Sequence, residues 1–111
     1  MDIKKIIQEI CSEDPMTFEN AFHTILPDVK KFKNDLVHAM KHEKNGKMRA
    51  RFIELLGHCL DESLIEDFEK ELSNPHHDVV SWSLFALENN PSPKGKNIAK
   101  KFREENPEFS E

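Results

Sequence analysis

The hydrophobic positions between residues 32 and 87 repeat once along the chain. Phe32, Leu36 and Met40 recur 32 positions later as Leu64, Phe68 and Leu72, and then Met48, Ile53, Leu55 and Leu56 recur 31 positions later as Val79, Leu84, Ala86 and Leu87. Spacings of three and four inside these sets predict amphipathic helices. A fixed period of this length is typical of stacked units, none of which can bury its apolar face alone.

The same periodicity and its breaks predict an all-α fold of six or seven helices. The expected helices cover residues 3–12, 17–25, 28–42, 48–60, 61–72, 75–89 and 92–105. Asn45-Gly46 marks a turn, and Asn74 is expected to cap the sixth helix with Pro75 in its first turn. No segment shows the sustained alternation of a strand. We expect one domain, with capping helices in 1–26, a first repeat in 28–60, a second in 61–90 and a capping helix in 92–105.

The segment from Met48 to Glu88 resembles a HEAT repeat. Leu55-Leu56-Gly57 and an acidic turn end one unit, an Asn-Pro turn follows the next helix, and Asp78-Val79-Val80 opens the helix after it. Arg49 matches the basic residue that the family commonly has after this opening, whereas Val80 replaces it in the second unit. The resemblance implies a right-handed stack of antiparallel helix pairs, an α-solenoid, and a role in binding rather than chemistry.

One face of the fourth helix is expected to be polar, and the repeat places aromatic residues at the equivalent positions of the sixth helix. Steps of 100° place Arg51, Glu54 and His58 opposite the apolar side of the fourth helix. Their counterparts 31 positions later are Trp82, Phe85 and Asn89. The family resemblance implies that the second helix of each unit faces the partner, so these six residues form one candidate interface. The alternative is that Ile98 and Phe102 of the last helix cover the two aromatic rings.

Charge is distributed unevenly along the chain. The net charge is −5, but residues 27–51 carry a net +5 and residues 53–78 a net −7. Six carboxylates crowd the fifth helix and its entry turn, with Lys70 as the only cation among them; they are Asp61, Glu62, Glu66, Asp67, Glu69 and Glu71, hereafter the acidic band. A band of one sign favours a basic protein partner that neutralises it, although a solvated helix face is the alternative.

The composition argues against catalysis, metals and nucleic acid. His38 and His42, or His76-His77-Asp78, lack a third ligand at a recognised spacing, so no metal or cofactor is expected. His58 and Cys59 are adjacent in a helix and point about 100° apart, which prevents them from sharing a proton. No catalytic residue is therefore assigned. The basic zone around Arg49 has no interleaved aromatic residues in an acidic protein, which disfavours nucleic acid and a HEAT-like DNA repair enzyme.

The N-terminal segment shows no apolar stretch of the signal-peptide type, and no run approaches the about 20 residues that cross a bilayer. We therefore expect a cytoplasmic protein without membrane association. Cys11 and Cys59 lie on apolar helix faces and are expected to be small buried side chains in a reducing compartment rather than a disulfide.

These observations together favour a protein-binding module that is a monomer when free. In its small size, its clustered negative charge and its lack of a catalytic motif, the chain resembles bacterial immunity proteins, including those of contact-dependent growth inhibition. That similarity implies that the chain binds and neutralises a basic toxin domain, such as a nuclease. The alternative is a HEAT-like scaffold or regulatory subunit that binds a cellular protein through the aromatic residues.

Overall fold

The computed structural model describes residues 1–109, and all its regular structure within that range is helical. The described residues form seven α-helices, which confirms the predicted all-α class. They are α1 (Ile3–Ile10), α2 (Pro15–Ile25), α3 (Lys33–His42), α4 (Gly46–Gly57), α5 (Ile65–Glu71), α6 (His77–Asn89) and α7 (Pro93–Glu105). Three 3₁₀ turns accompany them: η1 (Leu26–Asp28), η2 (Glu62–Leu64) and η3 (Pro107–Phe109).

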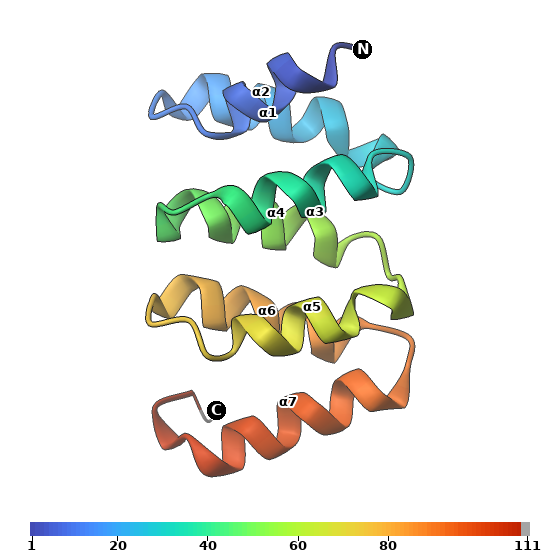
Figure 1. The fold of residues 1–111 in the computed structure, drawn as a ribbon, viewed down its shortest axis with the longest axis vertical. Helices are drawn as coiled ribbons and strands as arrows, with labels where there is room; N and C mark the ends of the chain where they lie inside the picture. The colour runs from blue at the N-terminus through green and yellow to red at the C-terminus, as the bar shows by residue number, and fades with distance from the viewer. Residues whose placement is uncertain (110–111) are drawn as a thin grey trace.

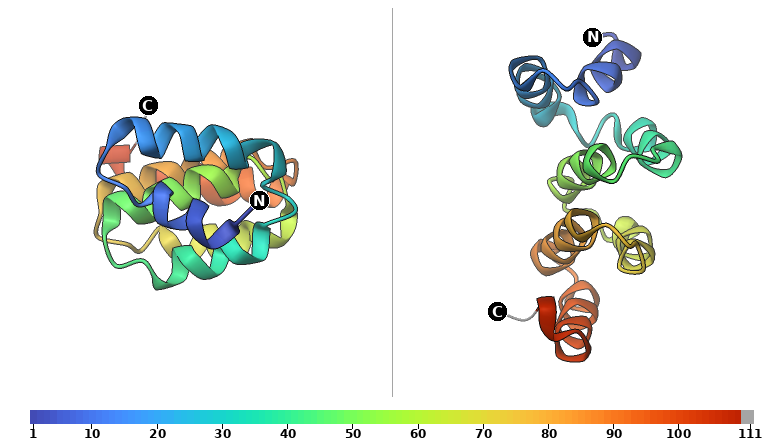
Figure 2. Two further views of the ribbon diagram at one scale, coloured as in Figure 1. Left: turned by 90° about the horizontal axis from the view of Figure 1, so that it is seen from above. Right: turned by 90° about the vertical axis from the view of Figure 1, so that its left-hand side faces the viewer.

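The helices pack in consecutive pairs along a molecule of 40 × 25 × 22 Å. The pairs α1–α2, α3–α4 and α5–α6 follow one another down the long axis, and α7 closes the lower end (Figure 1). Seen from the side, α1, α3 and α5 form one column and α2, α4 and α6 form the other (Figure 2). The α4–α6 contact is the most extensive between any two helices, so these two form the centre of the molecule.

The central helices are buried on more sides than one amphipathic stripe allows. In α4, Ala50 and Phe52 are buried together with the predicted Met48, Ile53, Leu55 and Leu56. The reason is that α4 contacts α3 on one side, α6 on another and the first pair on a third. Gly57 allows close packing here, because a Cβ at this position would lie 3.3 Å from the Cβ of Ala86 in α6. The core therefore runs continuously from pair to pair.

Two predicted helix starts are wrong by several residues. The third helix begins at Lys33 rather than at residue 28, because η1 and the following turns bend the chain and bury Val29. The fifth element divides into η2 and the short α5.

Two predicted helix boundaries around the central pair also differ. The sixth helix is capped by His76, whose Nδ1 accepts from the amide of Asp78 at 3.3 Å. The predicted cap, Asn74, instead accepts from the His76 amide at 2.8 Å, one step earlier in the turn. At the other boundary, α4 ends at Gly57 rather than residue 60, and Leu60 adopts a φ of 52° that no helix continues.

Candidate protein-binding surface

The acidic band is partly neutralised inside the molecule. Lys33 Nζ lies 2.7 Å from Asp61 Oδ2, Lys41 Nζ lies 3.0 Å from Asp67 Oδ1, and Arg49 pairs with Glu71. All three cations come from the preceding helix pair, so the basic segment and the acidic segment meet across one interface. Lys70 is the only cation within the acidic band, but the cations that pair with it come from outside that segment. The signal was present in the sequence, because opposite net charges fall on consecutive repeats.

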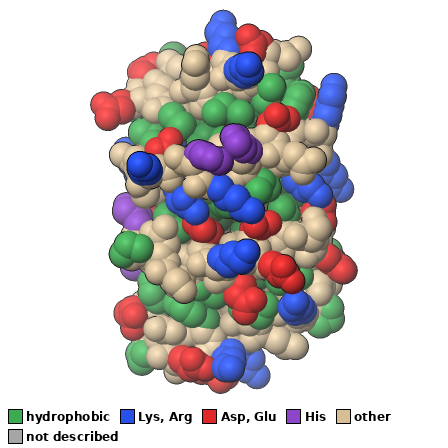
Figure 3. Space-filling view, in the orientation of Figure 1, with side chains coloured by type: hydrophobic (Ala, Val, Ile, Leu, Met, Phe, Trp, Pro, Cys, Tyr) green, Lys and Arg blue, Asp and Glu red, His purple; other side chains and the backbone are tan. Residues whose placement is uncertain are grey.

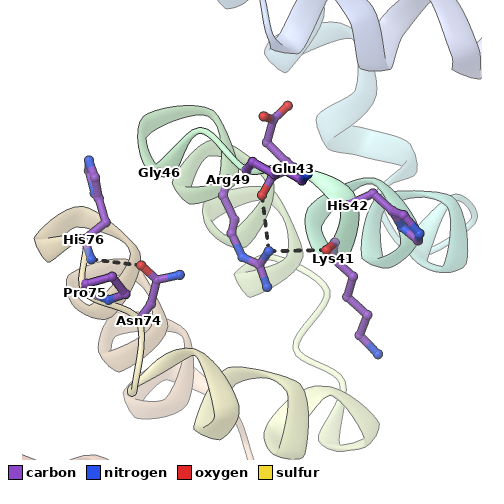
Figure 4. Close-up of a pocket in the computed structure, with 9 residues that line it drawn as sticks. Lys41, His42, Glu43, Gly46, Arg49, Asn74, Pro75 and His76 are labelled. Atoms are coloured by element: carbon purple, nitrogen blue, oxygen red, sulfur yellow. Dashed lines mark hydrogen bonds between the residues drawn. The ribbon is translucent and has the colours of Figure 1, made fainter.

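The Arg49–Glu71 pair is the most enclosed of these contacts. Arg49 Nε and Nη2 donate to the two carboxylate oxygens of Glu71 at 2.5 and 2.7 Å. Its Nη1 donates to the backbone carbonyls of Glu43 at 3.2 Å and Lys41 at 3.4 Å (Figure 4). Glu71 is buried, with 8% of its surface exposed. Both side chains therefore join α3, α4 and α5, and neither is presented to a partner.

Asp61 serves a similar local role at the start of the third pair. It accepts a hydrogen bond from Lys33, and its other oxygen accepts from the amide of Ser63 at 2.8 Å. The Lys33 hydrogen bond, followed by the bond from the Ser63 amide, lowers the pKa of Asp61 to about 2. This carboxylate therefore stays ionised over the whole physiological range and caps η2.

Three members of the acidic band remain exposed: Glu62, Glu66 and Glu69. Within residues 1–109, none of the three has a cation within ion-pairing distance. Figure 3 shows blue and red side chains interspersed on this side of the molecule rather than a single red field. The surface available to a basic partner is therefore about half as charged as the sequence suggests.

Arg51 does not face away from the core as its helical position predicts. Its Nη1 donates to the carbonyls of Ile10 at 2.7 Å and Ser12 at 2.8 Å, which are the free carbonyls at the end of α1. The guanidinium also lies 3.8 Å from the ring centroid of Phe18 in α2, a cation–π contact. The prediction failed because the first pair packs against this side of α4 and supplies partners for the charge.

The other two residues of the predicted polar stripe, Glu54 and the C-cap residue His58, differ in exposure. Glu54 is half-buried, and this burial raises the pKa of its carboxyl group, while the charges of His58 and Arg51 lower it in part. His58 is exposed, with its ring 6.5 Å from that of Phe22. Both residues therefore lie where α4 meets α2, next to aromatic rings of the first pair.

The aromatic residues of α6 remain accessible in part. Phe85 is 50% exposed, and its ring packs edge-on against Trp82 with centroids 5.6 Å apart. Trp82 is half-buried against the core. Asn89 is exposed and donates from Nδ2 to the Phe85 carbonyl at 2.8 Å. We call Glu54, His58, Trp82, Phe85 and Asn89 the second-helix face.

The last helix does not cover Phe85. Ile98 and Phe102 of α7 line a hollow together with Leu72, which follows α5 directly, and the ring centroids of Phe102 and Phe109 are 5.6 Å apart. Both side chains are therefore directed at the α5 side of the third pair. The interpretation that α7 seals both aromatic rings is wrong for Phe85, although Trp82 is partly covered by the core.

A larger hollow lies elsewhere, between the turns of the second and third pairs, and the sequence did not indicate it. It has a volume of about 640 Å³. It is lined by Lys41, His42, Glu43, Lys44, Gly46, Arg49, Asn74, Pro75 and His76 (Figure 4). Gly46 is required for this geometry, because a Cβ there would lie 2.3 Å from the His76 ring. Since Arg49 and Lys41 are engaged in ion pairs, the hollow offers no concentrated charge.

The cysteine and histidine side chains of residues 1–109 do not form a metal-binding group. Cys59 is buried and burial raises its pKa, which makes its thiol a poor nucleophile. The rings of His38 and His42 lie with centroids 4.2 Å apart and planes tilted by 33°, and His42 Nδ1 is 2.9 Å from the His38 carbonyl oxygen. Within residues 1–109 no three His, Cys, Asp or Glu side chains gather as metal ligands would. Cys11 and Cys59 are both free thiols.

No family model, curated protein or solved structure matches this chain. Among the described residues, no helix has the length and apolar character needed to cross a bilayer. The functional argument therefore depends on the surfaces themselves.

Proposed function

We propose that this chain is a non-catalytic protein-binding module built as a HEAT-like, right-handed α-solenoid. Its partner contacts the second-helix face. The observation that carries the proposal is the half-exposed ring of Phe85, which lies beside Trp82 on the central helix α6. Large aromatic side chains supply most of the affinity in many protein interfaces, especially when polar residues surround them. Here Asn89, whose Nδ2 donates to the Phe85 carbonyl, is a polar neighbour of that ring on α6.

Within this proposal, the more specific function is that of an immunity protein that neutralises a basic toxin domain. The net charge of −5 and the exposed Glu62, Glu66 and Glu69 support it. In that mechanism the glutamates accelerate the encounter, and the aromatic rings then hold the complex. The internal pairing of Asp61, Asp67 and Glu71 weakens this argument and favours the alternative, a scaffold or regulatory subunit that binds through the aromatic rings alone.

Affinity capture with a matched pair of variants tests the proposal. Tagged protein is incubated with lysate of the cells that encode it, and bound proteins are identified by mass spectrometry. We expect Phe85→Ser to lose the specific partner, because the exposed ring leaves the interface while the core stays intact. Lys100→Ser in α7 is the control, since Lys100 is exposed and belongs neither to the second-helix face nor to the acidic band. Equal recovery with both variants would overturn the proposal.

The rate of association with the partner, measured at low and high salt for a charge-reversed variant, distinguishes an immunity protein from a scaffold. For an immunity protein, reversing Glu66 and Glu69 to lysine slows association with a basic partner and removes most of its salt dependence. These two residues are better suited to this test than Asp67, because Asp67 also holds Lys41. A scaffold would show unchanged association after the reversal. An immunity gene is also expected directly downstream of a large secreted toxin gene.

A further inference from the structure

A second hollow lies at the α2 end of the second-helix face, and its walls combine aromatic rings with carboxylates. It has a volume of about 260 Å³ and is lined by Phe18, Glu19, Phe22, His23 and Glu54. This is below the about 300–1,000 Å³ of sites for small molecules. The hollow is therefore of a size for one long side chain of a partner rather than for a cofactor or a helix.

The chemistry of the walls specifies the charge of that side chain. Glu54 is half-buried, and within residues 1–109 its carboxylate has no hydrogen-bond or ion-pair partner. Glu19 adds a second carboxylate at the rim. The nearby charges of Arg51 and His58 offset only part of the cost of removing this carboxylate from water. A cation that enters the hollow and bonds the carboxylate directly recovers more of that cost. The occupant is therefore cationic.

The aromatic walls favour a planar cation over an ammonium group. Phe18 and Phe22 meet edge-to-face with ring centroids 5.7 Å apart, so the two rings present differently oriented surfaces. A guanidinium stacks on such rings, is weakly hydrated and bonds carboxylates through two parallel donors. The protein already uses this contact internally, since Arg51 lies 3.8 Å from the Phe18 ring. Arg51 itself does not line the hollow, because carbonyls at the end of α1 hold it.

The hollow is placed to act together with Phe85. Glu54 in α4 and Phe85 in α6 occupy equivalent positions 31 residues apart, on neighbouring helices of one column. Packed helices are about 8–10 Å apart, which is within the span of one contacting segment of a partner. We propose that the hollow between Phe18, Phe22 and Glu54 receives an arginine side chain of the partner protein, next to an apolar contact on Phe85. This inference rests on the proposed function and names the chemistry that its partner presents.

A peptide titration followed by NMR tests the inference without the partner. The full-length protein, labelled with ¹⁵N and ¹³C, is titrated with the blocked pentapeptide Ac-Gly-Gly-Arg-Gly-Gly-NH₂. A matched peptide with citrulline in place of arginine keeps the shape and removes the charge, and a lysine peptide tests the preference for a planar cation. We expect weak, saturable shifts at Phe18, Phe22 and Glu54 with arginine, smaller shifts with lysine and none with citrulline.

Variants then assign the binding to the hollow. Glu54→Gln is expected to weaken arginine-peptide binding about fivefold, the effect of one exposed charge pair. Phe22→Leu keeps an apolar wall and should also weaken it, whereas Glu66→Gln on α5 should leave it unchanged. Equal binding by the Glu54 and Glu66 variants, or shifts spread over all surface carboxylates, would overturn the inference. Because no partner takes part, that result would leave the dependence of partner capture on Phe85 as a separate finding.

Discussion

At the scale of single residues, the ion pairs show which charged side chains stabilise the fold and which are left exposed to a partner. Arg49 was recognisable in the sequence as a basic residue near the start of its helix, but its partner was not, because Glu71 lies 22 positions away on another helix. The fork of Arg49 satisfies both oxygens of Glu71 and two backbone carbonyls at once. Such a contact is worth more than an exposed pair, because its groups are shielded from water and fixed in geometry.

Replacing Arg49 should therefore destabilise the protein far more than replacing Lys41. We expect Arg49→Met to lower the free energy of unfolding by about 2–4 kcal/mol, since it leaves the buried carboxylate of Glu71 without a partner. Arg49→Lys should recover only part of this loss, because an ammonium group cannot make the same fork. Lys41→Met, which breaks an exposed pair, should cost less than about 1 kcal/mol. Equilibrium unfolding in urea measures all three, and equal losses for Arg49→Met and Lys41→Met would contradict the assignment.

At the scale of elements, the sequence predicted the helices well and their ends less well. Periodicity located all seven helices, because each buries an apolar stripe against a neighbour. The ends depend on local contacts that periodicity does not contain. Leu60 adopts a left-handed conformation that leucine rarely takes, so nothing in its identity marked the end of α4. In the same way His76, and not the better capping residue Asn74, begins α6.

Gly95 of α7 carries a testable consequence of close packing between elements. A Cβ at this position would lie 2.7 Å from the Leu87 carbonyl oxygen of α6, which belongs to the backbone and cannot move aside. Alanine is the better helix former by about 1 kcal/mol, yet we expect Gly95→Ala to lower stability by about 1–3 kcal/mol through overpacking. Asn97→Ala, an exposed position in the same helix, is the control and should be neutral or slightly stabilising. Thermal and urea unfolding compare them, and a more stable Gly95→Ala would show that α7 can shift away from α6.

At the scale of the whole molecule, charge complementarity between helix pairs decides how the candidate surface is interpreted. The sequence showed a net +5 in residues 27–51 and a net −7 in residues 53–78 but not that the two segments face each other. Repeat order contains that information, because consecutive repeats are neighbours in space. The order of the repeats does not predict that Phe85 is exposed. Its exposure depends on the position of α7, whose Ile98 and Phe102 pack near Leu72 instead of over Phe85.

The effect of salt on stability distinguishes a neutralised acidic band from one that awaits a basic partner. If the inter-pair contacts of Lys33, Lys41 and Arg49 dominate, screening weakens them and the free energy of unfolding falls as sodium chloride rises. We expect a loss of up to about 1 kcal/mol between roughly 0.05 and 0.5 M, over which the Debye length shortens severalfold. Urea is the denaturant of choice because it adds no ions.

The double variant Asp61→Asn/Asp67→Asn is the matched control for this salt effect. Asparagine keeps the capping oxygen at position 61 while it removes the charge, so the start of the third pair is preserved. The variant should lose less stability with salt than the parent protein, because two of the screened attractions are absent. A parent protein that becomes more stable with salt would mean that repulsion within the acidic surface outweighs its internal pairs. Such a surface would gain free energy from a basic partner, which would strengthen the immunity form of the function over the scaffold.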